Sequence, residues 1–182
     1  MTQIIKFIII GALLWVSQAQ AGPLHDAIRL RDTVELTRLL DAGADIHKRD
    51  WHGNTPLHTA AEKGVNNAIA ILLEAGANIE ARDENNDTPL VTAIKESQPE
   101  IVTLLLEKGA DAFAKDQWGQ LPLYVAAMAG QRDIFTLLLV AGAMDSLRDN
   151  DNKTPFDLIP VYSKLYKSPI WWRSRDAQYN AR

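Results

Sequence analysis

The sequence contains no cysteine among its 182 residues. Disulfide bonds, a thiol nucleophile and cysteine-ligated zinc are therefore excluded, and the fold must be held by packing alone. The sequence also has no surplus of basic residues, because 19 lysines and arginines stand against 23 aspartates and glutamates, a net charge of −4. This charge argues against a nucleic-acid-binding surface.

Motifs of common enzyme chemistry are missing as well. We find no G-x-S-x-G elbow, no phosphate-binding glycine loop and no H-E-x-x-H pattern. His47, Asp50 and His52 lie close together, but their spacing matches no standard set of metal ligands. The cluster of Asp83, Glu84 and Asp87 is simplest to explain as a solvated loop tip. We predict that the protein is not an enzyme, with no catalytic residue, no metal site and no cofactor.

The only long apolar run lies at the N-terminus. Lys6 precedes the apolar residues 7–16, and Ala19-Gln20-Ala21 follows them. This order is typical of a cleavable secretion signal. The run is short for a helix that crosses a membrane, which takes ~20 residues, although an uncleaved anchor or a buried first helix are alternatives. We expect a mature, soluble, monomeric chain from Gly22, located in a bacterial periplasm or secreted, without membrane association.

Beyond this segment the sequence repeats with a period of 33 residues. The Thr-Pro-Leu-His motif at 55–58 has counterparts at 22–25, 88–91, 121–124 and 154–157. A Gly-Ala pair, preceded by two leucines, keeps the same phase at 43–44, 76–77, 109–110 and 142–143. Such a period is typical of stacked helix pairs, because a single pair cannot bury its apolar face alone.

Local signals predict how each unit is built. Thr55 is expected to cap a first helix that has Pro56 at its first position, and Gly64 is expected to end that helix in a left-handed conformation. Ile69, Leu72 and Leu73 follow at helical spacing on one face of a second helix. Arg31 and Ser97 stand where other units have the helix-ending glycine. A polar stretch with an Asp-x-x-Gly or Asp-x-x-Asn turn completes the unit.

These motifs resemble the ankyrin repeat, and the resemblance extends from Gly22 to about Leu158. It implies an all-α ankyrin repeat solenoid of stacked helix-turn-helix units with projecting β-hairpin loops. We expect a signal peptide at 1–21, an N-terminal capping repeat at 22–54, and full repeats at 55–87, 88–120 and 121–153. Residues 154–182 are expected to form a partial fifth repeat, whose basic, aromatic tail is either a C-terminal cap or a binding arm.

In ankyrin proteins, partners usually contact the loop tips and the outer part of the first helices. The resemblance therefore implies that this chain binds another protein, which the sequence does not identify. Two tryptophans on polar turns are the kind of residue that anchors an interface. A basic residue before each loop aspartate is either an ion-pair partner or part of a binding row. The predicted protein-binding residues are Arg49, Trp51, His52, Arg82, Glu84, Asn85, Lys115, Gln117, Trp118, Arg148 and Asn150.

Three functions fit these features. The favoured one is a periplasmic adaptor or scaffold that binds a folded protein through its loop tips and concave face. The second is an inhibitor or self-protection protein of an exported enzyme. The third is attachment to the envelope through the basic, aromatic tail.

Overall fold

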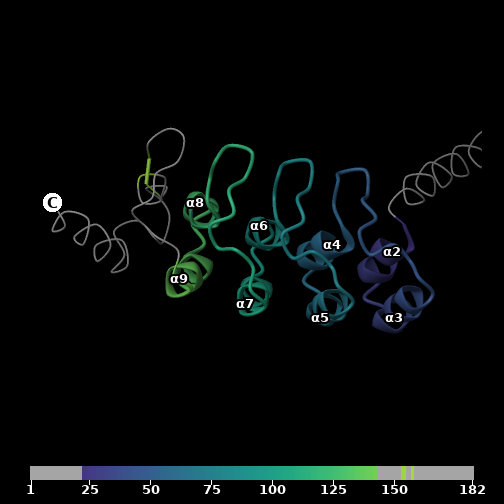
Figure 1. Ribbon diagram of the computed structural model, residues 1–182. Helices are drawn as coiled ribbons and strands as arrows, with labels where there is room; N and C mark the ends of the chain where they lie inside the picture. The colour runs from purple at the N-terminus through teal and green to yellow at the C-terminus, as the bar shows by residue number, and fades with distance from the viewer. Residues whose placement is uncertain (1–21, 143–152, 155–156, 158–182) are drawn as a thin grey trace, which may run out of the picture. The chain divides into compact units, whose positions relative to one another are not determined.

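The computed structural model describes residues 22–142, 153–154 and 157 (Figure 1). The chain divides into two compact units, Met1–Asn78 and Ile79–Arg182. The described residues hold eight α-helices and no strand. The predicted signal segment 1–21, the tail 160–182, Arg148 and Asn150 lie outside the described residues.

The first unit consists of two helix pairs. Its helices are α2 (Pro23–Arg29), α3 (Thr33–Asp41), α4 (Pro56–Lys63) and α5 (Asn66–Glu74). Within each pair the two helices pack on each other, and between pairs α2 packs on α4 and α3 on α5, giving two helical layers (Figure 1). The core between them is apolar and is at most 1% exposed at Leu24, Ile28, Leu36, Leu57, Ala60, Ala61, Ile69 and Leu72.

The second unit repeats this plan. Its helices are α6 (Pro89–Lys95), α7 (Pro99–Glu107), α8 (Pro122–Met128) and α9 (Arg132–Val140). The first helices α6 and α8 pack together, and the second helices α7 and α9 form the other layer (Figure 1). Within the described residues, no helix is long and apolar enough to span a membrane.

The Thr-Pro-Leu-His motif fixes the start of α4, as predicted. Nδ1 of His58 accepts the backbone N–H of Thr55 at 3.2 Å and lies 2.8 Å from the Thr55 hydroxyl oxygen. In the first repeat Gly22 replaces the threonine, so the equivalent His25 has no hydroxyl partner there. His25 instead donates from Nε2 to the carbonyl oxygen of Asn54 at 3.0 Å, which ties α2 to the loop before α4.

Burial of His25 makes the fold sensitive to acid. The side chain is fully buried, and this burial lowers its pKa despite the opposing bond to Asn54. The unfolded chain therefore binds a proton more readily than the folded chain. The contribution of neutral His25 to the free energy of unfolding is therefore full above about pH 6.5, the pKa of histidine in an unfolded chain. It falls as the pH drops from there toward the lower pKa that His25 has in the folded protein.

When the pH is lowered from about 7.5 to about 5.5, we expect the free energy of unfolding to fall less in His25→Gln than in the unchanged protein. The measurement is urea-induced unfolding followed by circular dichroism at both pH values. An equal loss in the two proteins would contradict this account of His25.

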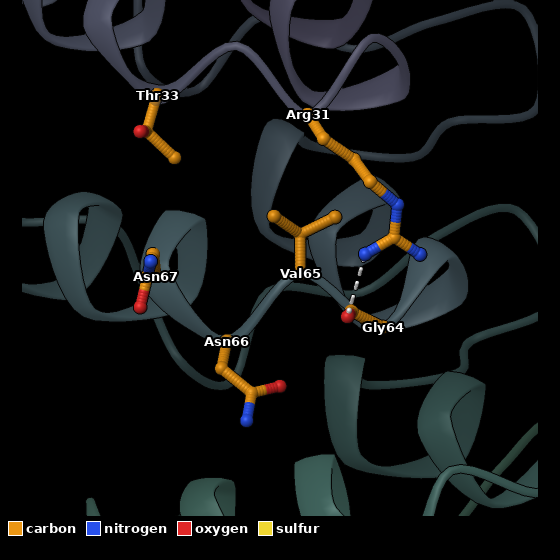
Figure 2. A pocket seen from close by; sticks show the side chains of 6 residues that line it. All are labelled: Arg31, Thr33, Gly64, Val65, Asn66 and Asn67. Atoms are coloured by element: carbon orange, nitrogen blue, oxygen red, sulfur yellow. Dashed lines mark hydrogen bonds between the residues drawn. The ribbon is translucent and has the colours of Figure 1, made fainter.

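Left-handed residues follow all four described first helices, and the one after α8 is Gly130 with φ 66°. Gly64 has φ 63°, as predicted, while Arg31 has φ 56° and Ser97 has φ 55°. Arg31 compensates for its conformation, because its guanidinium donates to the carbonyl oxygens of Lys63 at 2.7 Å and Gly64 at 3.3 Å. These are otherwise unsatisfied carbonyls at the end of α4. The guanidinium therefore closes one side of a polar recess of about 410 Å³, which Asn66 and Asn67 also line (Figure 2).

The paired leucines are not equivalent in the structure. The first leucine of the pair is fully buried at Leu72, Leu105 and Leu138. The second leucine, Leu73 in the first unit, is only half-buried. The predicted apolar face of α5 is therefore narrower than the sequence suggested, and Ile69 and Leu72 carry it.

Candidate functional site

An aspartate orders each of the three described loops. Asp50 Oδ1 accepts the backbone N–H groups of His52 at 3.0 Å and Asn54 at 2.9 Å. Asp116 Oδ1 accepts those of Trp118 and Gln120, both at 2.8 Å. The third loop uses Asp83 in the same way, accepting from Asn85 at 2.8 Å and Asp87 at 2.9 Å. A turn hydrogen bond rather than a strand ladder joins the loop ends, as from Asp50 N to Asn54 O at 2.9 Å.

Anchored turns leave both loop tryptophans at the surface. Trp51 is 59% exposed and Trp118 is 55% exposed, each directly after its loop aspartate. The ring of Trp51 contacts the ring of His52, which is also exposed. Since each backbone is held by hydrogen bonds, a partner could bind these rings at a low cost in conformational entropy.

Two of the basic residues that precede the loop aspartates, Arg49 and Arg82, form hydrogen bonds to backbone carbonyl groups. Arg49 donates to the carbonyl oxygen of Gly53 at 2.7 Å. Arg82 donates to that of Asn86 at 2.8 Å and also to that of Lys115. These contacts close the loops, so the regular spacing of the basic residues has a structural cause. Their role in binding stays a prediction.

The remaining predicted residues are distributed over the loop tips. Glu84, Asn85, Lys115 and Gln117 are exposed. In the second unit, Gln117 links two neighbouring loops, since its backbone N–H donates to Asn85 O at 3.3 Å and its side chain to Asn85 Oδ1 at 3.4 Å.

The expectation of a solvated acidic tip is wrong for Asp87. Asp83 is half-buried and Glu84 is exposed, but Asp87 is only 3% exposed and forms an ion pair with Lys95 of α6. The loop turns this side chain back onto the helix, which the local sequence pattern did not reveal. Burial raises the pKa of Asp87, the ion pair with Lys95 opposes this effect, and the charges of Asp83 and Asp116 add to it.

Lys95 and the predicted residue Trp118 line one recess, which the sequence did not predict. The Lys95 ammonium lies 5.6 Å from the centroid of the Trp118 ring, within the range of a cation–π contact. The recess has a volume of about 410 Å³ and lies within the second unit. Its lining residues come from α6, the loop and α8 with its C-cap: Lys95, Asp116, Trp118, Gln120, Val125, Met128 and Ala129.

Replacing Asp87 with asparagine should make the second unit slightly more stable. The raised pKa means that the folded state disfavours the ionised form of Asp87. This lowers the free energy of unfolding at pH values above the pKa of Asp87 in the folded protein, and the effect fades as the pH falls through that pKa. We expect Asp87→Asn to gain about 0.5 kcal/mol near neutral pH, on the scale of a partly exposed ion pair. Urea unfolding at neutral and acidic pH measures this gain. A variant that is less stable at neutral pH would show that the Lys95 ion pair outweighs burial.

Family models match most of this architecture. A model described as "Ankyrin repeats (3 copies)" matches residues 24–116, and one described as "Ankyrin repeats (many copies)" matches residues 105–159. The chain therefore belongs to the ankyrin repeat family, and the all-α repeat fold predicted from the period is confirmed. Ankyrin repeats serve as protein–protein interaction modules, and proteins built from them are generally not enzymes. Within the described part of the chain, no three acidic or histidine side chains are placed to hold a metal ion.

Curated relatives share short stretches with this chain. The ADP-ribosylation factor GTPase-activating protein AGD2 of Arabidopsis thaliana is 49% identical over 43 residues, which are 24% of this chain and 6% of that protein. NF-kappa-B inhibitor alpha of Sus scrofa is 47% identical over 45 residues, which are 25% of this chain and 14% of that protein. The matches thus span a small part of these longer proteins.

Proposed function

We propose that this protein is an exported adaptor or scaffold that binds a folded partner protein in the periplasm. The partner would be contacted by the loop tips and by the adjoining surface of the first helices. The observation that carries this proposal is the pair Trp51 and Trp118, two large aromatic side chains held outward on turns that aspartates anchor. Large exposed aromatics on ordered backbone are typical interface anchors.

Export is the second part of this proposal. It is supported by Lys6, the apolar residues 7–16 and the small residues of Ala19-Gln20-Ala21. We expect the protein recovered from a periplasmic extract to begin at Gly22, as measured by mass spectrometry of its N-terminal peptide. A chain that retains residues 1–21 and stays in the cytoplasmic fraction would contradict export.

Site-specific crosslinking tests the binding surface. A photoreactive amino acid placed at position 51 or 118 is expected to form a covalent adduct with one protein in intact cells, and mass spectrometry would identify it. The matched control is position 140, because Val140 is 82% exposed but lies on the second helix α9. Absence of adducts at both tryptophan positions, or the same adduct at position 140, would contradict the proposed surface.

An inhibitor of an exported enzyme is a second candidate. It is favoured by the match to a stretch of a protein whose name designates an inhibitor. In this case the crosslinked partner would be an enzyme, and adding the purified protein would lower that enzyme's activity. A partner whose activity is unchanged at saturation would leave the adaptor function as the better account.

A further inference from the structure

An ion pair between a first helix and the next loop exists in the first unit. Arg29, at the end of α2, donates from Nη2 to Asp50 Oδ2 at 3.4 Å. The other oxygen of Asp50 accepts the two backbone N–H groups of its own loop. The side chain of Asp50 is only 2% exposed, so a guanidinium completes the set of partners of a buried carboxylate.

The equivalent pair is not formed in the second unit. Two periods of 33 residues place Lys95 at the position of Arg29 and Asp116 at that of Asp50. Lys95 pairs instead with Asp87, which belongs to the loop before α6, and the same two periods place Ala21 at the position of Asp87. Asp116 is 5% exposed, and its Oδ2 has no hydrogen-bond partner in the described part of the chain. A buried carboxylate oxygen without a partner is costly and calls for a donor.

Asp116, whose Oδ2 lacks a partner in this part of the chain, is one of the residues that line the recess beside Trp118. The recess is also lined by the apolar residues Val125, Ala129 and Met128, and Met128 is 47% exposed. Among the residues that the structure describes in and beside this recess, two carboxylates, Asp87 and Asp116, lie near the one cation of Lys95. The group therefore lacks one positive charge, next to an aromatic face that already has a cation nearby.

We propose that this recess binds an arginine side chain of the partner protein, whose guanidinium donates to Asp116 as Arg29 does to Asp50. This inference rests on the proposed binding function and specifies which chemical group the partner presents. The aliphatic stem of the arginine packs against Met128, and its planar head lies against Trp118.

Arginine suits this recess better than other side chains. A guanidinium is planar and weakly hydrated, stacks on aromatic rings and donates to carboxylates in a fixed geometry. A lysine ammonium is a compact and strongly hydrated charge, which costs more to bury. A purely apolar side chain would fill the recess but leave the Asp116 oxygen without a donor.

Titration with small probes tests the proposal directly. The ¹⁵N-labelled protein is titrated with Nα-acetyl-arginine amide, and in parallel with the citrulline analogue, which has a similar shape but no charge. We expect the arginine probe to shift the backbone amides of Trp118 and Gln120 and the indole N–H of Trp118 in a saturable way. The citrulline probe should bind at least ~10-fold more weakly, because it loses a charge-assisted hydrogen bond.

Three variants localise the binding. Asp116→Asn keeps an amide oxygen for the two loop N–H groups but removes the charge, and should lose the preference for arginine over citrulline. The double variant Asp87→Asn with Lys95→Arg removes the competing carboxylate and places an arginine at the position that Arg29 has in the first unit. It should lose arginine binding because an internal guanidinium occupies Asp116. Asp50→Asn, the matched change in the first unit, should leave the shifts of Trp118 unaltered.

The outcomes separate this proposal from the proposed function. Equal binding of arginine and citrulline, no saturable shift, or unchanged preference in the double variant would overturn it. The double variant retains Asp116, so it decides the matter even if Asp116→Asn fails to fold. If the probe fails while crosslinks at positions 51 and 118 persist, the protein binds its partner without an arginine in this recess.

Discussion

Leu72→Ala is expected to lower the free energy of unfolding by about 2–5 kcal/mol. The Leu72 side chain is fully buried in α5, where this helix packs on α4 and α3. Truncation removes apolar contacts and leaves a cavity that short, mutually supported helices cannot easily fill. In a repeat fold each helix pair also depends on its neighbours, so the loss extends beyond one helix. Urea unfolding followed by circular dichroism measures it.

The neighbouring leucine is the matched control. Leu73 is only half-buried, so Leu73→Ala removes less apolar surface from the core and should cost clearly less than Leu72→Ala. Equal losses for the two variants would mean that the second leucine of the pair contributes as much to packing as the first. The same order is expected for Leu105 and Leu106 in α7.

Replacing Trp51 and Trp118 together with alanine is expected to abolish partner capture. Truncating one interface anchor costs about 2 kcal/mol or more, which corresponds to roughly 30-fold in Kd. Two anchors that act independently would weaken binding by roughly a thousandfold. Affinity of the purified variant for the crosslinked partner, measured by surface plasmon resonance, tests this loss.

Stability provides the control for the tryptophan variants. Trp51 and Trp118 are more than half exposed, so their removal should leave the urea unfolding midpoint nearly unchanged. Val140→Ala, on the exposed face of α9, should alter neither stability nor capture. Full affinity of the double tryptophan variant would show that the interface lies elsewhere on the protein.

The repeat fold could be predicted from the sequence because its signals are local and recur. Thr55 with Pro56 at the start of α4 and the left-handed Gly64 at its end depend on backbone preferences within a few residues. The loop turns could be predicted for the same reason, since Gly53, Asn86 and Gly119 all take positive φ. Exposure of Trp51 and Trp118 followed from their position on these turns.

The recess could not be predicted, because it depends on contacts between residues distant in the sequence. Asp87 looked like part of a solvated tip, since nothing in its local pattern shows that the loop returns it to α6. The repeat places Lys95 where the first unit has Arg29, which pairs with Asp50. Periodicity alone therefore predicts that Lys95 pairs with Asp116, the counterpart of Asp50. Only the packed second unit shows that Asp87 takes the ammonium.

The sequence by itself determined the family, the start and end of α4 and the exposure of the two loop tryptophans, because these follow from short-range backbone preferences and a 33-residue period. The tertiary structure decided that Leu72 rather than Leu73 is buried, where Arg31 donates and which carboxylate pairs with Lys95. The physical reason is that a long side chain chooses its partner among all groups that folding brings near. In the second unit this choice leaves Oδ2 of Asp116 without a hydrogen-bond donor among the described residues.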